Sequence, residues 1–102
     1  MKTTVQSLHF VANALLTAYA EEKVNKLSHL NQEIIAGDVC LKLEKSDHAN
    51  DKCCELKLSI PGNALFAKSS CKTFEEAINK SVEALQSQLR KQKTKLMNQR
   101  QS

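Results

Sequence analysis

Several kinds of residue are scarce in this sequence, and each scarcity excludes a class of protein. Only two Gly occur in 102 residues, so the chain has neither a glycine-rich loop that could cradle phosphates nor the glycines of a nucleophile elbow. Aromatic residues make up 4% and Trp is absent, which argues against a surface that binds single strands by stacking their bases. No apolar run reaches the roughly 18 residues of a membrane-spanning helix, and we therefore expect no membrane partner.

What is present suffices for one folded domain. The chain is 41% hydrophobic and 25% charged, which supports a core and excludes a disordered chain. Its length is that of a typical single domain. We expect one domain over residues 1–98, followed by a short polar tail over residues 99–102.

Positive charge is concentrated at the C-terminal end. The formal net charge is +4, but all eleven Asp and Glu residues lie within residues 1–83, together with ten of the fifteen Lys and Arg. Residues 84–102 therefore carry five basic residues and no acidic residue. Such a segment on a nearly neutral body indicates a polyanionic partner, nucleic acid before an anionic lipid surface; the alternative is a solvated helix end.

The N-terminus imitates a secretory signal. Lys2 precedes an apolar stretch over residues 8–16, and small residues follow at 18–20. His9 and Asn13 interrupt that stretch, and the apolar pattern continues in helical spacing beyond residue 20. We therefore expect no cleavage and a cytoplasmic protein.

The four cysteines are then expected to be free thiols, because the compartment is reducing. Cys40, Cys53, Cys54 and Cys71 form no Cys-x-x-Cys motif. A zinc site built on Cys53 and His48 would lack any recognisable ligand spacing. We expect no metal and no other cofactor.

Period-two alternation of apolar and polar residues predicts four strands. These are residues 3–8, 38–45, 53–60 and 64–70. Between the last two, Pro61-Gly62-Asn63 is a strong turn signal and indicates a hairpin.

Helical periodicity predicts two helices. The first runs from the N-cap Asn13 to about Ser28. The second runs from Thr73, which forms a capping box with Glu76, to about Asn98. The fold class is therefore α+β in the order β-α-β-β-β-α, with a four-stranded mixed sheet, a parallel first crossover and both helices on one face.

The other sheet face is expected to remain open to water. Ile34 and Ile35, in the connection over residues 31–37, are expected to close the core. The inward-facing strand residues are expected to be Val39, Leu41, Leu43, Cys54, Leu56, Leu58, Ile60, Leu65 and Ala67. Phe66 and Lys68 are expected to face outward.

The second helix is predicted to extend beyond the sheet. It should be about 39 Å long at 1.5 Å per residue, whereas strands of this length span only about 20–27 Å. The cationic side chains expected on its outer side or beside its core edge are Lys80, Arg90, Lys91, Lys93 and Lys95. On the first helix, Lys23 and Lys26 share a flank with Tyr19. Cations spaced by a helical turn suit the phosphates of structured RNA, with little reading of bases.

An enzymatic function finds no support in the sequence. His9, His29 and His48 lie in three separate segments without a motif partner, and Ser69-Ser70-Cys71 lacks an elbow glycine. We expect no catalysis and no small-molecule substrate.

Five stretches, in order and suitably spaced, resemble those of the ribosome hibernation promoting factors, also called ribosome-associated inhibitors or sigma-54 modulation proteins. They are Glu22–Leu27, Val39–Lys45, Leu58–Gly62, Phe74–Ile78 and, above all, Ala84–Leu96 with the letters ALQSQLRKQKTKL. The resemblance covers nearly the whole chain.

The resemblance implies a fold like that of double-stranded-RNA-binding domains. It also implies docking on the small ribosomal subunit between head and body, over the messenger and transfer-RNA sites, with repression of translation in stationary phase or stress. The contacts to ribosomal RNA that it implies are made by Lys23, Lys26, Arg90, Lys91, Lys93 and Lys95.

The sequence departs from the family pattern at two positions. Ala84 and Ser87 stand where family members usually carry basic residues, and Lys80 lies one turn earlier. We therefore expect RNA contact to concentrate between Arg90 and Lys95. Long members add a C-terminal domain that pairs two ribosomes; this chain is similar to a short member, for which pairing would require an accessory factor.

Two alternatives remain open at the level of sequence. One is a regulatory protein that binds a partner or itself through the open sheet face, with Phe66, Cys40 and Cys53 at the interface. The other is a general domain for structured RNA without preference for ribosomes.

Overall fold

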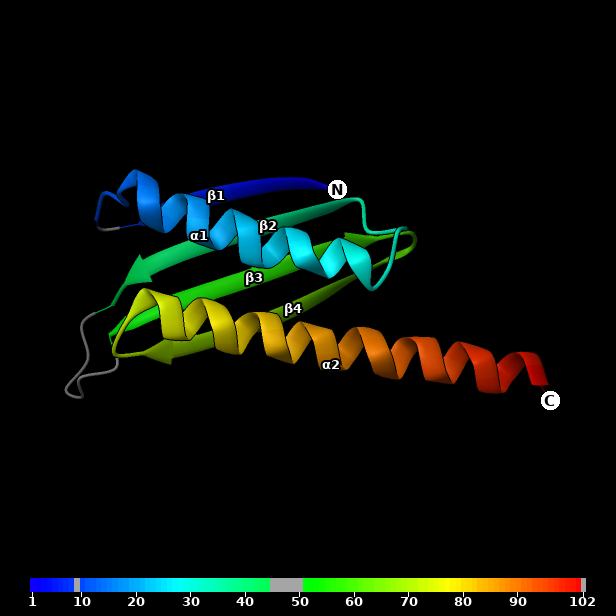
Figure 1. The fold of residues 1–102 in the computed structure, drawn as a ribbon. Coiled ribbons are helices and arrows are strands. Elements are labelled where there is room, and N and C mark those ends of the chain that lie inside the picture. Colours follow the sequence, from blue (N-terminus) through cyan, green and yellow to red (C-terminus); the bar gives the residue numbers. More distant parts are fainter. Residues whose placement is uncertain (9, 45–50, 102) are drawn as a thin grey trace.

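Alternating strands and two amphipathic helices form the fold that the sequence predicts. The computed structural model describes the backbone of residues 1–8, 10–44 and 51–101, with side chains as far as Lys91. The elements, in order, are β1 (Lys2–Leu8), α1 (Ala14–Asn25), a short 3-10 helix η1 (Lys26–His29), β2 (Ala36–Leu43), β3 (Lys52–Ile60), β4 (Asn63–Cys71) and α2 (Phe74–Gln101) (Figure 1). The predicted order β-α-β-β-β-α is confirmed.

The four strands form one mixed sheet in the order β1-β2-β3-β4. Strand β1 pairs in parallel with β2, because α1 carries the chain back between them, whereas β2–β3 and β3–β4 are antiparallel. The register places Val39 opposite both Val5 and Leu56, on the core face. Gly62 has φ 75° in the two-residue β3–β4 connection, where a side chain would be strained.

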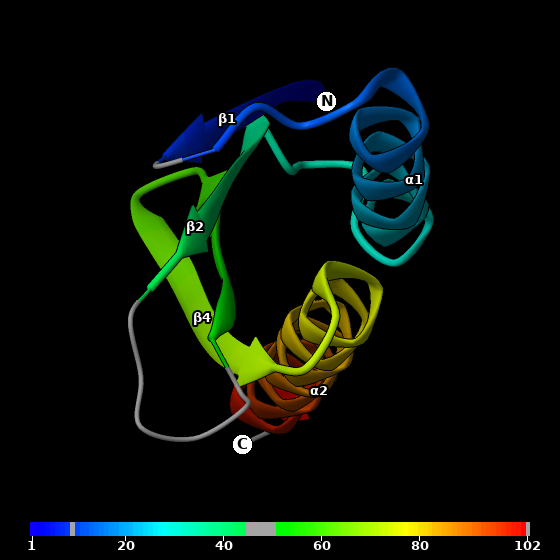
Figure 2. The same cartoon turned by 90° about the vertical axis from the view of Figure 1, so that its left-hand side faces the viewer.

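Both helices cover the same face of the sheet (Figures 1 and 2). Leu16, Ala20 and Val24 of α1 are buried against it, as are Ile78 and Leu85 of α2. The core between the layers includes Leu41, Leu56 and Leu58, each fully buried. No helix of the described residues lies over the opposite sheet face, as the strand alternation predicts (Figure 2).

Both predicted N-caps are confirmed. The side chain of Asn13 accepts a hydrogen bond from the backbone N–H of Leu16 at 2.8 Å. The Thr73 hydroxyl accepts one from the backbone N–H of Glu76 at 3.2 Å. Each cap satisfies a donor that the first helical turn leaves without an intrahelical partner, and each therefore fixes where its helix begins.

Two predicted core residues lie outside the core. Ile35 is 59% exposed, whereas its neighbour Ile34 is 4% exposed. Backbone bonds from Lys2 to Ile35 and from Ile35 to Ser59 hold this segment beside the sheet, and β2 already begins at Ala36. Successive residues of extended chain face opposite sides, so only one of the two isoleucines can be buried. Leu43 is 36% exposed because it is the last residue of β2, at the end of the sheet.

Helix α2 extends past the sheet and ends later than predicted. Its 28 residues correspond to about 42 Å at 1.5 Å per residue, and its C-terminal part projects beyond β3 and β4 (Figure 1). The predicted polar tail over residues 99–102 is helical as far as Gln101. Gln and Arg are good helix formers and no Gly or Pro follows, so nothing ends the helix near Asn98. No helix in the described chain is long and apolar enough to cross a membrane.

Candidate nucleic-acid interface

The apolar stripe of α2 determines which of its side chains face solvent. Val82, Leu85 and Leu89 are buried against the sheet. The Ser81 hydroxyl, also buried, donates a hydrogen bond to the Cys54 carbonyl of β3 at 3.2 Å. These contacts fix the rotation of the helix about its own axis, so the residues on its opposite side are held outward.

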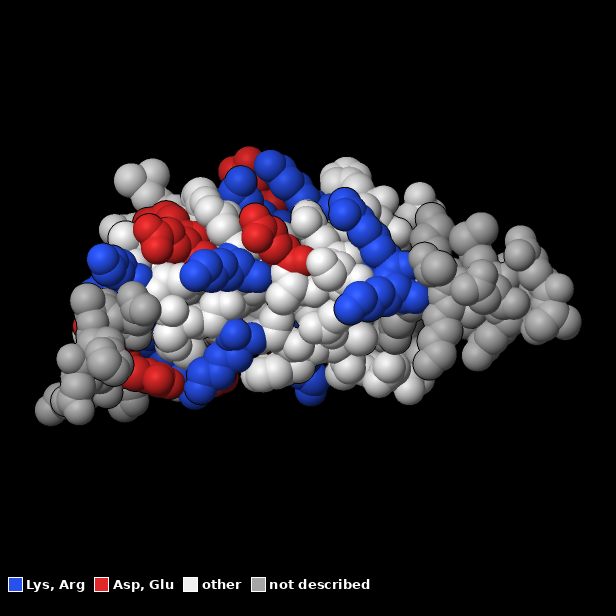
Figure 3. Space-filling view, turned by 90° about the horizontal axis from the view of Figure 1, so that it is seen from below, with Lys and Arg blue, Asp and Glu red and all other residues white. Residues whose placement is uncertain are grey.

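The predicted basic residues of α2 lie on that outward side as far as the side chains are described. Lys80, Arg90 and Lys91 are exposed. The side chains of Lys93 and Lys95 lie outside the described part, although the helix backbone continues through both. Figure 3 shows Lys and Arg side chains gathered next to the C-terminal end of the described surface. This arrangement brings Arg90 and Lys91 together and leaves Lys80 separate.

The outer surface of α2 lacks cations between Lys80 and Arg90. Ala84 and Ser87 are both exposed there. The eleven helical steps from Lys80 to Lys91 cover about 16 Å along the axis. The two missing basic residues of the family pattern therefore leave this solvent-facing stretch of α2 without a cation, and the exposed Glu83 adds a negative charge to it.

The two predicted basic residues of α1 have different surroundings. The Lys23 ammonium lies over the Tyr19 ring, 5.4 Å from its centroid. Lys26 forms an ion pair with Glu22 at 3.9 Å, one helical turn earlier. The ion pair with Glu22 was not among the expectations from the sequence, although the i,i+4 spacing of Glu and Lys indicates it.

Tyr19 also joins the two helices. Its hydroxyl donates a hydrogen bond to the Asn79 side-chain oxygen of α2 at 3.0 Å. Nearer the starts of the helices, the Phe10 and Phe74 rings stack with centroids 4.5 Å apart. No local pattern in the sequence indicates the Tyr19–Asn79 bond, because 60 residues separate its partners.

The outer sheet face also carries lysines, and acids neutralise two of them. The Lys42 ammonium lies 3.0 Å from the Glu55 carboxylate. The Lys68 ammonium lies 3.6 Å from Glu55 and 3.8 Å from Glu44. The hydrogen bond from Lys42 lowers the pKa of Glu55, which therefore stays ionised at neutral pH. These two lysines are consequently poor candidates for phosphate binding.

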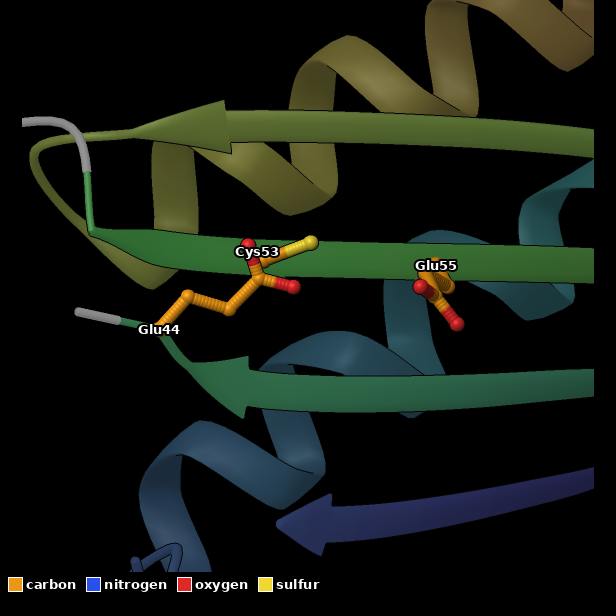
Figure 4. Close-up of side chains that lie close together, drawn as sticks. All are labelled: Glu44, Cys53 and Glu55. Atoms are coloured by element: carbon orange, nitrogen blue, oxygen red, sulfur yellow. The ribbon is translucent and has the colours of Figure 1, made fainter. Parts of the chain in front are cut away.

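Cys53 is buried, contrary to the expectation that it contributes to an exposed interface. It faces the outer side of the sheet but is 0% exposed. Its thiol and the carboxylates of Glu44 and Glu55 lie within 4.8 Å of one another (Figure 4). Glu55 of the same strand and Glu44, directly after β2, thus lie beside its thiol, which a strand pattern cannot indicate.

This cluster is also a potential metal-ligand set, the one group of its kind in the described residues. Its chemistry does not favour a cation, because Lys42 and Lys68 already pair with its two carboxylates. The zinc partner considered for Cys53, His48, lies outside the described residues. Burial raises the pKa of Cys54 to about 12, so that thiol is neither a ligand nor a nucleophile at neutral pH.

Other predicted outward residues are exposed as expected. Phe66 is 56% exposed, and Cys40 is partly exposed. Both line a shallow groove on the outer sheet face. His29 lies exposed in η1, and His9 is outside the described residues.

Comparisons with known proteins agree with this architecture. A family model described as "Sigma 54 modulation protein / S30EA ribosomal protein" matches residues 3–97. A protein of Deinococcus radiodurans named ribosome hibernation promotion factor is 32% identical over 84 residues, which are 81% of this chain and 44% of that protein. The chain thus spans less than half the length of this relative.

Two solved structures share the fold. A ribosomal subunit interface protein from Coxiella burnetii superimposes with a TM-score of 0.80 at 16% identity, over 92% of this chain and 99% of that one. The N-terminal domain of Protein Y from Thermus thermophilus gives 0.75 at 18% identity, over 89% and 98%. With its fold and nearly all its residues matched, the chain belongs to the family of sigma 54 modulation proteins and S30EA ribosomal proteins.

Proposed function

We propose that this protein is a ribosome hibernation factor. It binds the small ribosomal subunit between head and body, covers the messenger and transfer-RNA sites, and represses translation in stationary phase or stress. Its family consists of ribosome-associated factors and is not an enzyme family. The proposal includes a cytoplasmic location and no cofactor, small-molecule substrate or membrane partner.

One observation carries the proposal: the exposed cations of α2 lie where the helix leaves the sheet. In the described part of the chain, neither Lys80 nor Lys91 has an ion-pair partner. The helix end projects from the body, so it can enter a channel lined by RNA without a clash from the sheet. Ammonium and guanidinium groups at one-turn spacing bind phosphates and release counterions. Ribosomal RNA of the small subunit is the polyanion that family membership favours.

The residues proposed to contact RNA fall into two groups. The main group is at the end of α2, namely Arg90, Lys91, Lys93 and Lys95. The supporting group is Lys23, Lys26 and Lys80. Because the surface between Lys80 and Arg90 has no cation and carries the exposed Glu83, most of the affinity should come from the main group.

The test is co-sedimentation of Lys91→Glu/Lys95→Glu with purified small ribosomal subunits. Each lost phosphate contact should reduce the dependence of log affinity on log salt by about one, and affinity at about 0.15 M salt should fall about 100-fold. The matched control is Lys2→Glu/Lys57→Glu, which makes the same charge change at exposed positions of the sheet. Unchanged sedimentation of the α2 variant, or an equal loss in the control, would contradict the proposal.

Competition with an unrelated RNA duplex separates the ribosome factor from a general RNA-binding domain. We expect an excess of duplex to leave the complex with the small subunit intact. If the duplex displaces the protein at an equal concentration of sites, the general RNA-binding function replaces the proposed one.

A protein interface on the outer sheet face is a second candidate, which the exposure of Phe66 favours. Its residues would be Phe66 and Cys40, because Cys53 is buried. Phe66→Ser should then dissociate a self-associated species in sedimentation velocity, whereas Lys91→Glu should leave it unchanged. A wild-type protein that is monomeric throughout would remove self-association by this face.

A further inference from the structure

We propose that Tyr19 is a positioning residue for RNA binding, a role that rests on the proposed function. Its ring holds the Lys23 ammonium on the surface of α1, and its hydroxyl ties that surface to Asn79 of α2. Tyr19 itself is half-buried and packs against the core, so its ring is a fixed support. It prepares Lys23 for a phosphate without contacting the phosphate itself.

The contact with the ring leaves the ammonium of Lys23 available. A lysine side chain loses rotamer entropy when it is immobilised at an interface, and that loss opposes binding. A cation held over an aromatic face has already lost part of this freedom, and among the described residues no acid forms an ion pair with Lys23. Lys26 shows the opposite case, because Glu22 competes for its ammonium with any incoming phosphate.

The hydroxyl of Tyr19 adds one hydrogen bond between the two helices. Asn79 immediately precedes Lys80 in α2, so this bond links the segments that carry Lys23 and Lys80. The helices are also held by the buried side chains of their shared core, and the Phe10–Phe74 stack joins the loop before α1 to the start of α2. Changes at Tyr19 should therefore alter the placement of Lys23 and leave the packing of the helices in place.

The experiment is a double-mutant cycle of Tyr19→Leu and Lys23→Ala, measured as affinity for purified small ribosomal subunits. We expect Tyr19→Leu to weaken binding by about two- to fivefold in the wild-type background, and not at all in the Lys23→Ala background. Tyr19→Phe keeps the ring and should retain most of the affinity. An equal loss in both backgrounds, or no loss in the wild type, would overturn the proposal.

Two further measurements keep the test decisive. The Lys23 side-chain methylene resonances should shift in the NMR spectrum when Leu replaces Tyr19 and remain in place with Phe, because they lie beside the ring. Tyr19→Met is a second ringless variant should the leucine variant fail to fold, since Met adapts to irregular space.

Lys91→Glu/Lys95→Glu in the same assay distinguishes a failure of the positioning role of Tyr19 from a failure of the proposed function. If this variant loses binding while Tyr19→Leu keeps it, the positioning role is wrong and the proposed function stands. If neither variant loses binding, both are wrong.

Discussion

Lysines on the outer sheet face and lysines on α2 are alike in sequence and different in their surroundings. On the sheet, Lys42 and Lys68 pair with Glu55, and Lys68 also with Glu44. On α2, Lys80 and Lys91 have no ion-pair partner among the described residues. The sheet thus has a balanced surface, whereas the end of α2 presents positive charge to a partner.

The difference shows why net charge is a poor guide to binding. A phosphate that approaches the sheet would have to displace a carboxylate from each lysine that it engages, and the gain and the loss would nearly cancel. A phosphate that binds Lys91 displaces only loosely held counterions, which favours binding. The placement of acids therefore decides which basic residues can bind RNA.

Completing the family pattern on α2 should give the largest change. Ala84→Arg/Ser87→Arg places two cations on the exposed surface between Lys80 and Arg90 and should strengthen binding to small subunits about tenfold, with a salt dependence steeper by about two. Thr4→Arg/Gln6→Arg adds the same charge at exposed positions of β1 and is the control. Filter binding across a salt series measures the affinity and its salt dependence for both variants. Equal gains in the two variants would mean that net charge alone drives association.

Breaking the ion pairs of the sheet should change stability and leave RNA binding unaltered. Glu55→Gln removes the acid that serves both lysines and should lower the urea midpoint at pH 7 by a few tenths of a molar. The Lys42 hydrogen bond lowers the pKa of Glu55 in the folded protein. The contribution is therefore present above the ordinary carboxyl pKa of about 4.3 and is lost as pH falls through the folded value.

Urea titrations of wild type and Glu55→Gln from pH 7 to pH 3 test whether the stabilisation from Glu55 is lost as the pH falls. The two midpoints should converge at the acid end. Glu33→Gln, at an exposed position, is the control and should change the midpoint little at any pH. A constant difference across the range would show that the charge of Glu55 does not stabilise the fold.

Releasing Lys26 should have the smallest effect. Glu22→Gln removes the carboxylate 3.9 Å from its ammonium and should raise affinity for small subunits by about twofold, because the pair is exposed and screened. Glu21→Gln removes an exposed neighbouring acid. Comparing the two variants separates the effect of breaking the Glu22–Lys26 ion pair from the effect of the change in net charge. If both variants gain equally, Lys26 is not the residue released.

Most of the fold could be predicted because its signals are local. The Asn13 cap, the Thr73 cap, the hairpin at Gly62 and the outward position of Phe66 are each found where the sequence places them. Ile35 and Leu43 were wrongly predicted to be buried, because periodicity does not show where a sheet ends or which of two adjacent apolar residues faces the core.

The candidate site was predictable only in part. Residue type and helical spacing indicated that Lys80, Arg90 and Lys91 face outward, and they do. The roles of Lys93 and Lys95 stay predictions. The neutralisation of Lys42 and Lys68 and the burial of Cys53 depend on residues in neighbouring strands, so no local pattern could indicate them.

The sequence by itself determined the order of the elements, the face that each presents to the core and the concentration of positive charge in the last helix. Periodicity, capping residues and charge are properties of neighbouring positions, so they can be read directly. Only the tertiary structure decided which lysines are neutralised and that Tyr19 of α1 supports Lys23 and bonds to Asn79 of α2. Those contacts join residues that are close only after the helices and strands have packed.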